Sequence, residues 1–330
     1  MFLNLILEEG YIQNMKKYFL GKTGIKVTEL CFGVLPIGPL QANISVEKGA
    51  KLIHTALERG INFIDTAEVY QTYPHIKKAL EGYKGEVIIT TKSYAKTYTE
   101  MEKSIQYALK SLDRDYIDIF LMHAAKASPS VFEERAGALQ CLNDYKAKGT
   151  IRAIGISTHV IGIVKRATEI EEIDIIFPII NKLGIGIVGG SVEDMIKAIS
   201  EAHKAGKGLY AMKALGGGHL IDQLEEAFHF VRNIKGISSL AVGMVSSEEL
   251  ELNLKIFNDE EIPKGLLTQK IKPSKRLFIS NFCKGCGTCV KICPNNALTL
   301  ENGKAVVDHK LCLLCGYCNP VCPQFAIRLI

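Results

Sequence analysis

Short apolar runs alternate with longer amphipathic ones from Met15 to about Ile262. The short runs are rich in Ile and Val, as buried parallel strands are. Helical periodicity fills the gaps, with apolar residues spaced at about 3.6 in Val46–Arg59, Thr99–Leu112 and Val131–Lys148. The apolar runs predict strands near Thr28–Gly33, Asn62–Thr66, Val87–Thr91, Tyr116–Met122, Ala153–Ser157, Ile173–Phe177, Leu209–Met212 and Ser239–Gly243.

Regular strand–helix units over roughly 250 residues predict an α/β fold of the (β/α)8, or TIM, barrel type. A doubly wound open sheet is the alternative, and the regularity of the units favours closure. The opening segment Tyr18–Val27, centred on Gly21-Lys-Thr-Gly24, predicts a hairpin that plugs the barrel floor.

The pattern breaks between Pro263 and about Pro273, where proline, glycine and scattered lysines indicate a linker. We therefore expect a barrel over 15–262, a linker over 263–273 and a second domain over 274–330. Met15 opens a more ordinary start than Met1, so we expect residues 1–14 to be an extension that does not belong to the native chain.

The second domain contains a repeat of the spacing C-x2-C-x2-C-x3-C-P. Cys283-Lys-Gly-Cys286-Gly-Thr-Cys289-Val-Lys-Ile-Cys293-Pro294 recurs as Cys312-Leu-Leu-Cys315-Gly-Tyr-Cys318-Asn-Pro-Val-Cys322-Pro323, and Ala297 has its counterpart in Ala326. A tight loop with a thiolate at every third position can bind three corners of one iron–sulfur cubane. The fourth cysteine, on the helix leading away, then ligates the other cluster.

This spacing predicts two [4Fe-4S] clusters. Gly287 and Gly316 suit the sharp backbone of such loops. Zinc prefers paired CxxC hooks, and disulfides are disfavoured in a reducing compartment. The segment resembles bacterial-type two-cluster ferredoxins, which implies a small α+β fold. The predicted ligand sets are Cys283, Cys286, Cys289 and Cys322 for one cluster, and Cys293, Cys312, Cys315 and Cys318 for the other.

Composition narrows the classes of function. No apolar run approaches the ~20 residues that span a bilayer, and the first seven residues lack the basic start of a signal peptide. We therefore expect a cytoplasmic protein with no membrane partner. The net charge of +5 is mild for a chain of this size. Nucleic-acid-binding proteins usually carry a concentrated basic stripe, so we do not expect this chain to bind nucleic acid. The lone cysteines, Cys31 and Cys141, are expected to be small buried apolar residues.

Residues 271–330 are basic, with only Glu301 and Asp308 against a larger set of cations. A basic face around a cluster would attract an acidic redox partner protein. The equally weighted alternative is that these cations offset the negative charge of the clusters. The cations are Lys272, Lys275, Arg276, Lys284, Lys291, Lys304, Lys310 and Arg328.

Polar residues follow the predicted second, third and fourth strands, at the barrel end where such folds carry their chemistry. Asp65-Thr-Ala-Glu-Val-Tyr70, then Thr91-Lys92, then Leu112-Asp-Arg-Asp-Tyr-Ile-Asp-Ile-Phe-Leu-Met-His123, resemble the aldo-keto reductase signature in its usual order. The resemblance extends over most of residues 15–260, and the cysteine repeat points to an iron–sulfur-bearing branch. The alternative is a purely structural role, in which Asp65 and Lys92 form a buried ion pair and His123 is an ordinary core histidine.

The resemblance implies a reaction. Tyr70 would be the general acid that protonates a carbonyl oxygen, and Lys92 beside it would lower the Tyr70 pKa. Asp65 would hold Lys92 in place, and His123 would orient the carbonyl. Hydride would come from a nicotinamide lying across the barrel mouth. Many relatives have glycine where Gln71 follows the tyrosine, so the particular aldehyde, ketone or alcohol substrate is not implied.

The resemblance also implies contacts for the nicotinamide. Phe177 replaces the family's usual glutamine. Glu249 stands where NADPH-preferring members carry a basic residue, so NAD(H) is favoured over NADP(H), or nicotinamide binding is weak. The predicted contacts are Ser157, Thr158, Asn181, Gly216, Gly217, Gly243, Ser246, Ser247, Glu249 and Asn253.

These expectations favour an oxidoreductase that reduces an aldehyde or ketone with a nicotinamide, or runs the reverse reaction. The alternative is an electron-transfer protein, in which the barrel is a docking scaffold and the clusters relay electrons to a partner. A third interpretation makes the clusters structural, clamping the C-terminus near the barrel mouth. We see no flavin motif that would couple hydride transfer to single-electron transfer.

Overall fold

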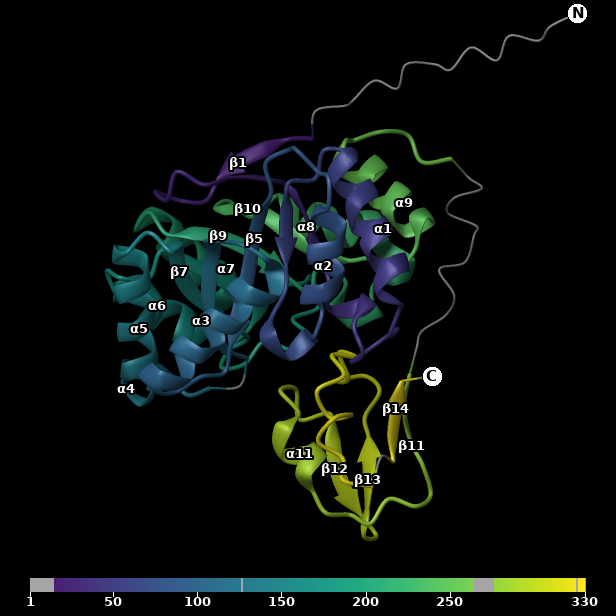
Figure 1. Ribbon diagram of the computed structural model, residues 1–330. Coiled ribbons are helices and arrows are strands. Elements are labelled where there is room, and N and C mark those ends of the chain that lie inside the picture. Colours follow the sequence, from purple (N-terminus) through teal and green to yellow (C-terminus); the bar gives the residue numbers. More distant parts are fainter. Residues whose placement is uncertain (1–14, 126, 264–275, 325, 330) are drawn as a thin grey trace, which may run out of the picture.

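The structure is a computed structural model that describes residues 15–125, 127–263, 276–324 and 326–329 (Figure 1). The expected N-terminal extension, 1–14, lies outside the described residues. So does the expected linker, 263–273, apart from Pro263.

Eight parallel strands form a closed barrel in the order β10-β3-β4-β5-β6-β7-β8-β9. The predicted barrel is confirmed, and the open-sheet alternative is wrong. Each observed strand overlaps its predicted run, because the barrel interior covers one face of every strand and the helices cover the other, which suits continuous Ile and Val runs. The strands are β3 (Leu30–Gly33), β4 (Phe63–Asp65), β5 (Ile88–Ser93), β6 (Ile117–Ala124), β7 (Ile151–Thr158), β8 (Ile175–Pro178), β9 (Gly208–Met212) and β10 (Ile237–Gly243).

A hairpin closes the N-terminal end of the barrel, as predicted. Its strands, β1 (Lys17–Phe19) and β2 (Lys26–Thr28), pair antiparallel. Leu20 and Ile25 from its turn are fully buried among the side chains that fill the barrel interior. Gly21 has no room for a side chain, since a Cβ would lie 2.4 Å from the Gly208 nitrogen.

Helices cover the outside of the barrel. The single helix predicted over Val131–Lys148 is wrong, because the chain leaves helical geometry at Arg135 (φ −121°, ψ 30°), whose guanidinium donates to the His123 carbonyl at 2.9 Å. The longer helices are α1 (Val46–Glu58), α2 (Tyr73–Leu80), α3 (Tyr98–Leu112), α5 (Ala136–Ala147), α6 (Ile161–Glu169), α7 (Val192–Lys204), α8 (Leu224–Arg232) and α9 (Ser247–Phe257). The short ones are α4 (Val131–Glu134) and the 3-10 turns η1 (Leu35–Ile37), η2 (Glu68–Tyr70), η3 (Gly216–Gly218) and η4 (Ile221–Gln223).

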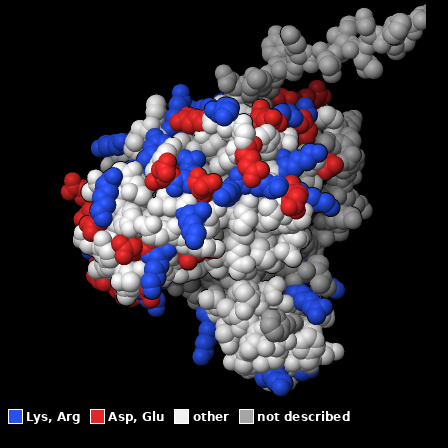
Figure 2. All heavy atoms as spheres, in the orientation of Figure 1, with Lys and Arg blue, Asp and Glu red and all other residues white. Residues whose placement is uncertain are grey.

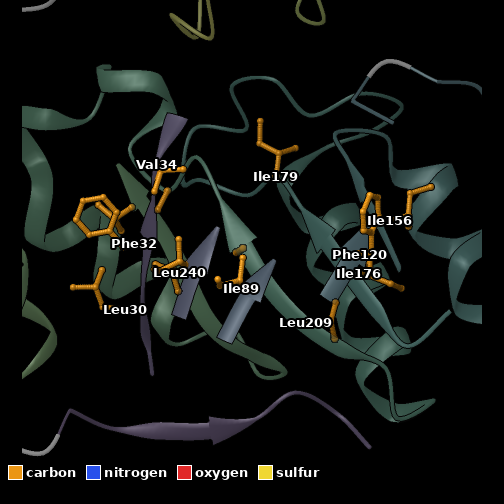
Figure 3. Close-up of a cluster of buried hydrophobic side chains, with 14 of the residues drawn as sticks. Leu30, Phe32, Val34, Ile89, Phe120, Ile156, Ile176, Ile179, Leu209 and Leu240 are labelled. Carbon is orange, nitrogen blue, oxygen red and sulfur yellow. The ribbon is translucent and has the colours of Figure 1, made fainter. Parts of the chain in front are cut away.

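Alternation along the strands divides the buried side chains between two layers. Leu30 and Phe32 of β3 face outward and pack under the helices, in the layer that Figure 3 shows. Cys31, between them, faces the barrel interior. Cys31 and Cys141 are both fully buried, as predicted. Alternation therefore determines which side chains of each strand fill the barrel interior and which pack under the helices.

The C-terminal module, 276–329, lies at the end of the barrel opposite β1 (Figure 1). It contains α11 (Thr288–Ile292) and two antiparallel pairs, β11 (Leu277–Ile279) with β14 (Ile327–Leu329) and β12 (Leu298–Glu301) with β13 (Lys304–Val307). A helix was expected before each fourth cysteine. The second repeat has only turns there, because Pro320 disfavours helical geometry at Asn319. Among the described residues, no helix is long and apolar enough to cross a membrane.

Candidate functional site

Four polar side chains meet at the C-terminal end of the barrel. Asp65 ends β4, Tyr70 ends η2 just beyond it, Lys92 lies near the end of β5 and His123 near the end of β6. The Lys92 ammonium donates to Asp65 Oδ2 at 2.8 Å and to the Thr66 carbonyl at 2.5 Å. The other oxygen of Asp65 accepts from the Tyr210 hydroxyl at 2.9 Å. The expected ion pair is therefore formed, and it holds the lysine in one position.

Burial is the largest influence on the pKa values of Lys92 and Tyr70. Lys92 is only 1% exposed, and burial lowers its pKa while the Asp65 carboxylate opposes that shift. Burial also raises the pKa of Tyr70 well above its usual value. The expected lowering of this pKa is wrong, because burial and the nearby Asp65 carboxylate both raise it, although the Lys92 ammonium lies 4.9 Å from the centre of the ring. Tyr70 therefore keeps its proton, as an acid must.

His123 is held between aromatic rings. It stacks on Tyr94, with ring centres 4.2 Å apart and planes 11° apart. Burial lowers its pKa well below the usual value, so the ring is neutral at physiological pH. Its Nε2 atom lies 3.0 Å from the hydroxyl of Tyr317, a residue of the C-terminal module. Sequence reasoning missed both Tyr94 and Tyr317.

A cavity of about 310 Å³ opens beside Asp65 and Tyr70. Of the predicted nicotinamide contacts, Gly217, Gly243 and Glu249 line it. Its remaining lining residues include Leu35, Pro36, Phe177, Met212, Lys213, Val242, Leu313 and Leu314. Its walls are thus mostly apolar, and they lie against the side chains of Asp65 and Tyr70.

The other predicted contacts lie elsewhere. Ser157 lines a smaller cavity, of about 30 Å³, with Lys92 and His123, and its buried hydroxyl has no hydrogen-bond partner. Asn181 bonds both the amide and the carbonyl of Ile185 in its own loop. Thr158, Gly216, Ser246, Ser247 and Asn253 line neither cavity, and their contact with a nicotinamide stays a prediction.

The larger cavity fits a nicotinamide ring. Phe177 lines it and stacks on Tyr210 at 3.8 Å between ring centres, which gives a flat apolar wall. Gly243 also lines it, with no room for a side chain, since a Cβ would lie 2.3 Å from Pro36 Cγ. Ser157, whose buried hydroxyl has no hydrogen-bond partner among the described residues, lines the smaller cavity and not this one, so its contact with a carboxamide stays a prediction.

The module gathers its cysteines in two sets. Cys293, Cys312, Cys315 and Cys318 line one hollow, which brings the fourth cysteine of the first repeat to the second loop. Burial raises the pKa of the Cys289 thiol, and the neighbouring Cys283 and Cys286 add to that shift, while Cys322 is buried in the same small core as Cys289. Backbone amides of Ala297 and Ala326 each donate to a cysteine sulfur at 3.3 Å, so the two halves match.

These sets fit thiolates that carry clusters, because amide donors stabilise sulfur charge. Across the described ranges, no three His, Cys, Asp or Glu side chains converge on a point where one metal ion would sit. The cluster sites are therefore inferred from the grouping of the thiols and from the comparison with known families below.

The second cysteine loop packs on the barrel mouth. The Gln41 amide donates to the Leu314 carbonyl at 2.9 Å, and His219 Nε2 lies 3.0 Å from the Cys312 carbonyl. Leu313 is 3% exposed and belongs to the barrel's apolar core. Cys315 and Tyr317 line the small cavity that contains Lys92 and His123. Gly217, one of the predicted nicotinamide contacts, also packs on the Leu313 backbone, where a Cβ would lie 2.6 Å from the carbonyl oxygen.

A closed barrel with this polar group at its mouth, joined to a double cysteine motif, defines an iron–sulfur oxidoreductase. Comparison with known families agrees. Residues 29–235 match the aldo/keto reductase family, and residues 282–326 match a 4Fe-4S dicluster domain. The chain belongs to the aldo/keto reductase family and carries a second, iron–sulfur domain.

The individual relatives below share less than a third of their aligned residues with this chain. The chain is 26% identical to "L-galactose dehydrogenase" of Arabidopsis thaliana over 280 residues, which cover 71% of this chain and 86% of that protein. It is 29% identical to "Methylglyoxal reductase DkgA" of Salmonella typhimurium over 54% of this chain and 63% of that protein. A putative aldo-keto reductase of Pseudomonas aeruginosa has the same fold, with a TM-score of 0.65 and 23% identity over 76% of this chain and 98% of that one.

Proposed function

We propose that the barrel reduces a small aldehyde or ketone with a nicotinamide cofactor, or catalyses the reverse oxidation. The observation that carries this proposal is the meeting of Asp65, Tyr70, Lys92 and His123 beside a cavity that fits the nicotinamide ring. When bound there, the nicotinamide supplies the hydride.

The chain's own residues supply the proton and the orientation. Tyr70, kept protonated by burial, donates the proton to the carbonyl oxygen. Lys92, fixed by Asp65 at 2.8 Å, places a positive charge under the Tyr70 ring and stabilises the phenolate that forms. His123 is neutral and positions the oxygen through Nε2. Proton donation by a positioned acid typically contributes about 10²–10⁴-fold to rate.

We propose NAD(H) as the preferred cofactor. Glu249 lines the cavity and accepts from the Val245 amide at 2.6 Å, which fixes its carboxylate at the start of α9. A fixed carboxylate repels the 2′-phosphate of NADP(H) and can accept a hydrogen bond from a ribose hydroxyl. Small carbonyl compounds are the proposed substrate class, as the names of the relatives suggest, and methylglyoxal is a suitable first probe.

We propose that the module binds two [4Fe-4S] clusters. An outer cluster would be held by Cys283, Cys286, Cys289 and Cys322, and a barrel-side cluster by Cys293, Cys312, Cys315 and Cys318. The outer loop faces solvent, with Phe282 54% exposed and Lys284 exposed beside Cys283. Figure 2 shows basic side chains and hardly any acidic ones on the visible face of the module.

This exposure favours a second candidate function, electron relay to an acidic partner protein that docks at the outer loop. In that case the barrel would be a scaffold and would not need to bind a nicotinamide. The two candidates therefore differ in whether cluster-loaded protein consumes NAD(P)H.

The deciding experiment is anaerobic oxidation of NADH and of NADPH with a panel of small aldehydes, methylglyoxal included. We expect turnover with NADH that falls about 10²–10⁴-fold in Tyr70→Phe, because the ring stays and only the proton donor is lost. Tyr18→Phe, an exposed change in the floor hairpin, is the matched control and should leave the rate unchanged. No binding of either cofactor by cluster-loaded protein would favour the relay.

A further inference from the structure

The hydroxyl of Tyr317 lies at the position that the proposed reaction reserves for a carbonyl oxygen. It is 3.0 Å from His123 Nε2, and it is also a hydrogen-bond partner of Tyr70. These are the two groups proposed to orient and protonate a substrate. Tyr317 lies between Cys315 and Cys318 of the cluster module, so both contacts join that module to the barrel.

The direction of these hydrogen bonds follows from the unpaired atom of His123. Nδ1 of this buried ring has no partner in the structure. A buried N–H without a partner is rarer than a buried acceptor without one, so the proton belongs on Nε2, which then donates to Tyr317. A phenolic oxygen accepts two hydrogen bonds and donates one. Tyr317 can therefore accept from His123 while its own hydroxyl donates to Tyr70 or to Tyr94.

The remaining space is too small for a substrate. The cavity shared by Tyr317, Lys92 and His123 holds about 30 Å³, room for a water molecule or two. A carbonyl ligand would have to take the place of the Tyr317 hydroxyl to reach His123 and Tyr70.

The loop that carries Tyr317 is fixed at several points. Gly316 approaches the barrel so closely that a Cβ would lie 2.3 Å from the Leu40 carbonyl oxygen. The Gln41 and Leu314 hydrogen bond anchors the loop on one side, and His219 with Cys312 anchors it on the other. The cysteine motif itself does not require the tyrosine, because the equivalent residue of the first repeat is an exposed threonine, Thr288.

We propose that Tyr317 is a built-in occupant of the carbonyl-oxygen site, so that a small carbonyl or carboxylate ligand and the second cysteine loop compete for hydrogen bonds with His123 and Tyr70. This inference rests on the proposed function for the identity of the ligand. Ligand binding displaces the hydroxyl, and the loop thereby limits which ligands enter.

The test uses cluster-loaded protein and acetate, whose carboxylate accepts the same hydrogen bonds but is not reduced by a nicotinamide. Isothermal titration calorimetry under anaerobic conditions compares wild type with Tyr317→Phe and Tyr317→Ala. Removing the hydroxyl leaves His123 and Tyr70 without this hydrogen-bond partner, so we expect acetate to bind about tenfold more tightly to Tyr317→Phe. Tyr317→Ala should bind it at least as tightly, since it also frees volume. Tyr18→Phe is the matched control.

Acetate affinity that is the same in wild type and both Tyr317 variants, or no acetate binding to any of them, would overturn the proposal. A parallel assay separates it from the proposed function. In methylglyoxal reduction, Tyr317→Phe should lower KM about tenfold and change kcat much less. Tighter acetate binding without turnover in any protein would sink the carbonyl reaction alone, whereas turnover with an unchanged KM would sink the role of Tyr317 alone.

Discussion

The two cysteine loops have the same spacing, yet one faces solvent and the other faces the barrel. Lys284 in the first loop is exposed, whereas its counterpart Leu313 is 3% exposed within the barrel core. Thr288 is exposed, whereas its counterpart Tyr317 contacts His123. The cysteines of such a motif determine what it binds, and the residues between them determine where it lies.

A backbone detail supports this distinction. Gly285 and its counterpart Leu314 both adopt left-handed geometry, with φ of 62° and 47°. Glycine adopts this geometry freely, whereas other residues pay about 1–2 kcal/mol. Leu314 lines the larger cavity and its carbonyl accepts from Gln41, so contacts with the barrel offset the strain. In the first loop Gly285 has no room for a side chain, since a Cβ would lie 2.2 Å from the Gly303 carbonyl oxygen.

Removing one equivalent thiol from each loop should give the largest difference. We expect Cys315→Ala to lose the barrel-side cluster and to weaken NADH binding about tenfold or more, because Leu313 and Leu314 then no longer form a fixed apolar wall. Cys286→Ala should lose the outer cluster and leave NADH affinity unchanged. Anaerobic iron analysis and equilibrium titration with NADH measure both effects.

Equal loss of NADH affinity in the two cysteine variants would contradict this asymmetry, since it would mean that the module acts on the cavity only as a whole. Retention of full iron content in either variant would contradict the ligand assignment instead.

We expect a smaller effect from substituting residues that lie between the cysteines. Leu313→Ala should lower the free energy of unfolding by about 2–4 kcal/mol, because it removes a buried side chain from the interface between barrel and module. Lys284→Ala, at the equivalent exposed position, should change it by less than about 0.5 kcal/mol. Anaerobic urea titration followed by circular dichroism compares the two, and similar midpoints would mean that the packing of the second loop contributes little.

Much of the barrel was predictable because its signals are local. Apolar runs predicted every barrel strand with small errors at the ends, as at β7, which begins at Ile151 and not at Ala153. Strand order then placed Asp65, Lys92 and His123 at one end. The sequence did not predict the directions in which loop side chains point. Asn181 turns into its own loop because a nearby amide and carbonyl need partners, which no periodicity reveals.

Docking of the module near the barrel mouth was only the third interpretation of the sequence, and it named none of the residues that dock, although the sequence contains their signals. Leu313-Leu314 stands where the first repeat has Lys284-Gly285, and Tyr317 stands where it has threonine. Such a contrast indicates a covered surface without saying what covers it. That answer depends on contacts between residues nearly two hundred positions apart, such as Tyr317 with His123.

The smallest predicted effect concerns Lys213 and tests the same asymmetry between the two cysteine loops. It lines both cavities, interacts electrostatically with the thiols of Cys312 and Cys315, and pairs with no carboxylate of the described residues. A half-buried ammonium favours the more negative, reduced state of a neighbouring cluster. Lys213→Met should therefore lower the reduction potential of the barrel-side cluster, on the order of 50–100 mV, and hardly move that of the outer cluster.

Potentiometric titration followed by electron paramagnetic resonance separates the two potentials. Lys284→Met removes an exposed ammonium beside the outer loop, where water and salt screen the charge, so the shift there should be much smaller. Equal shifts in the two variants would show that both clusters are solvated alike. That result would contradict the view that the barrel mouth encloses one cluster and leaves the other to solvent.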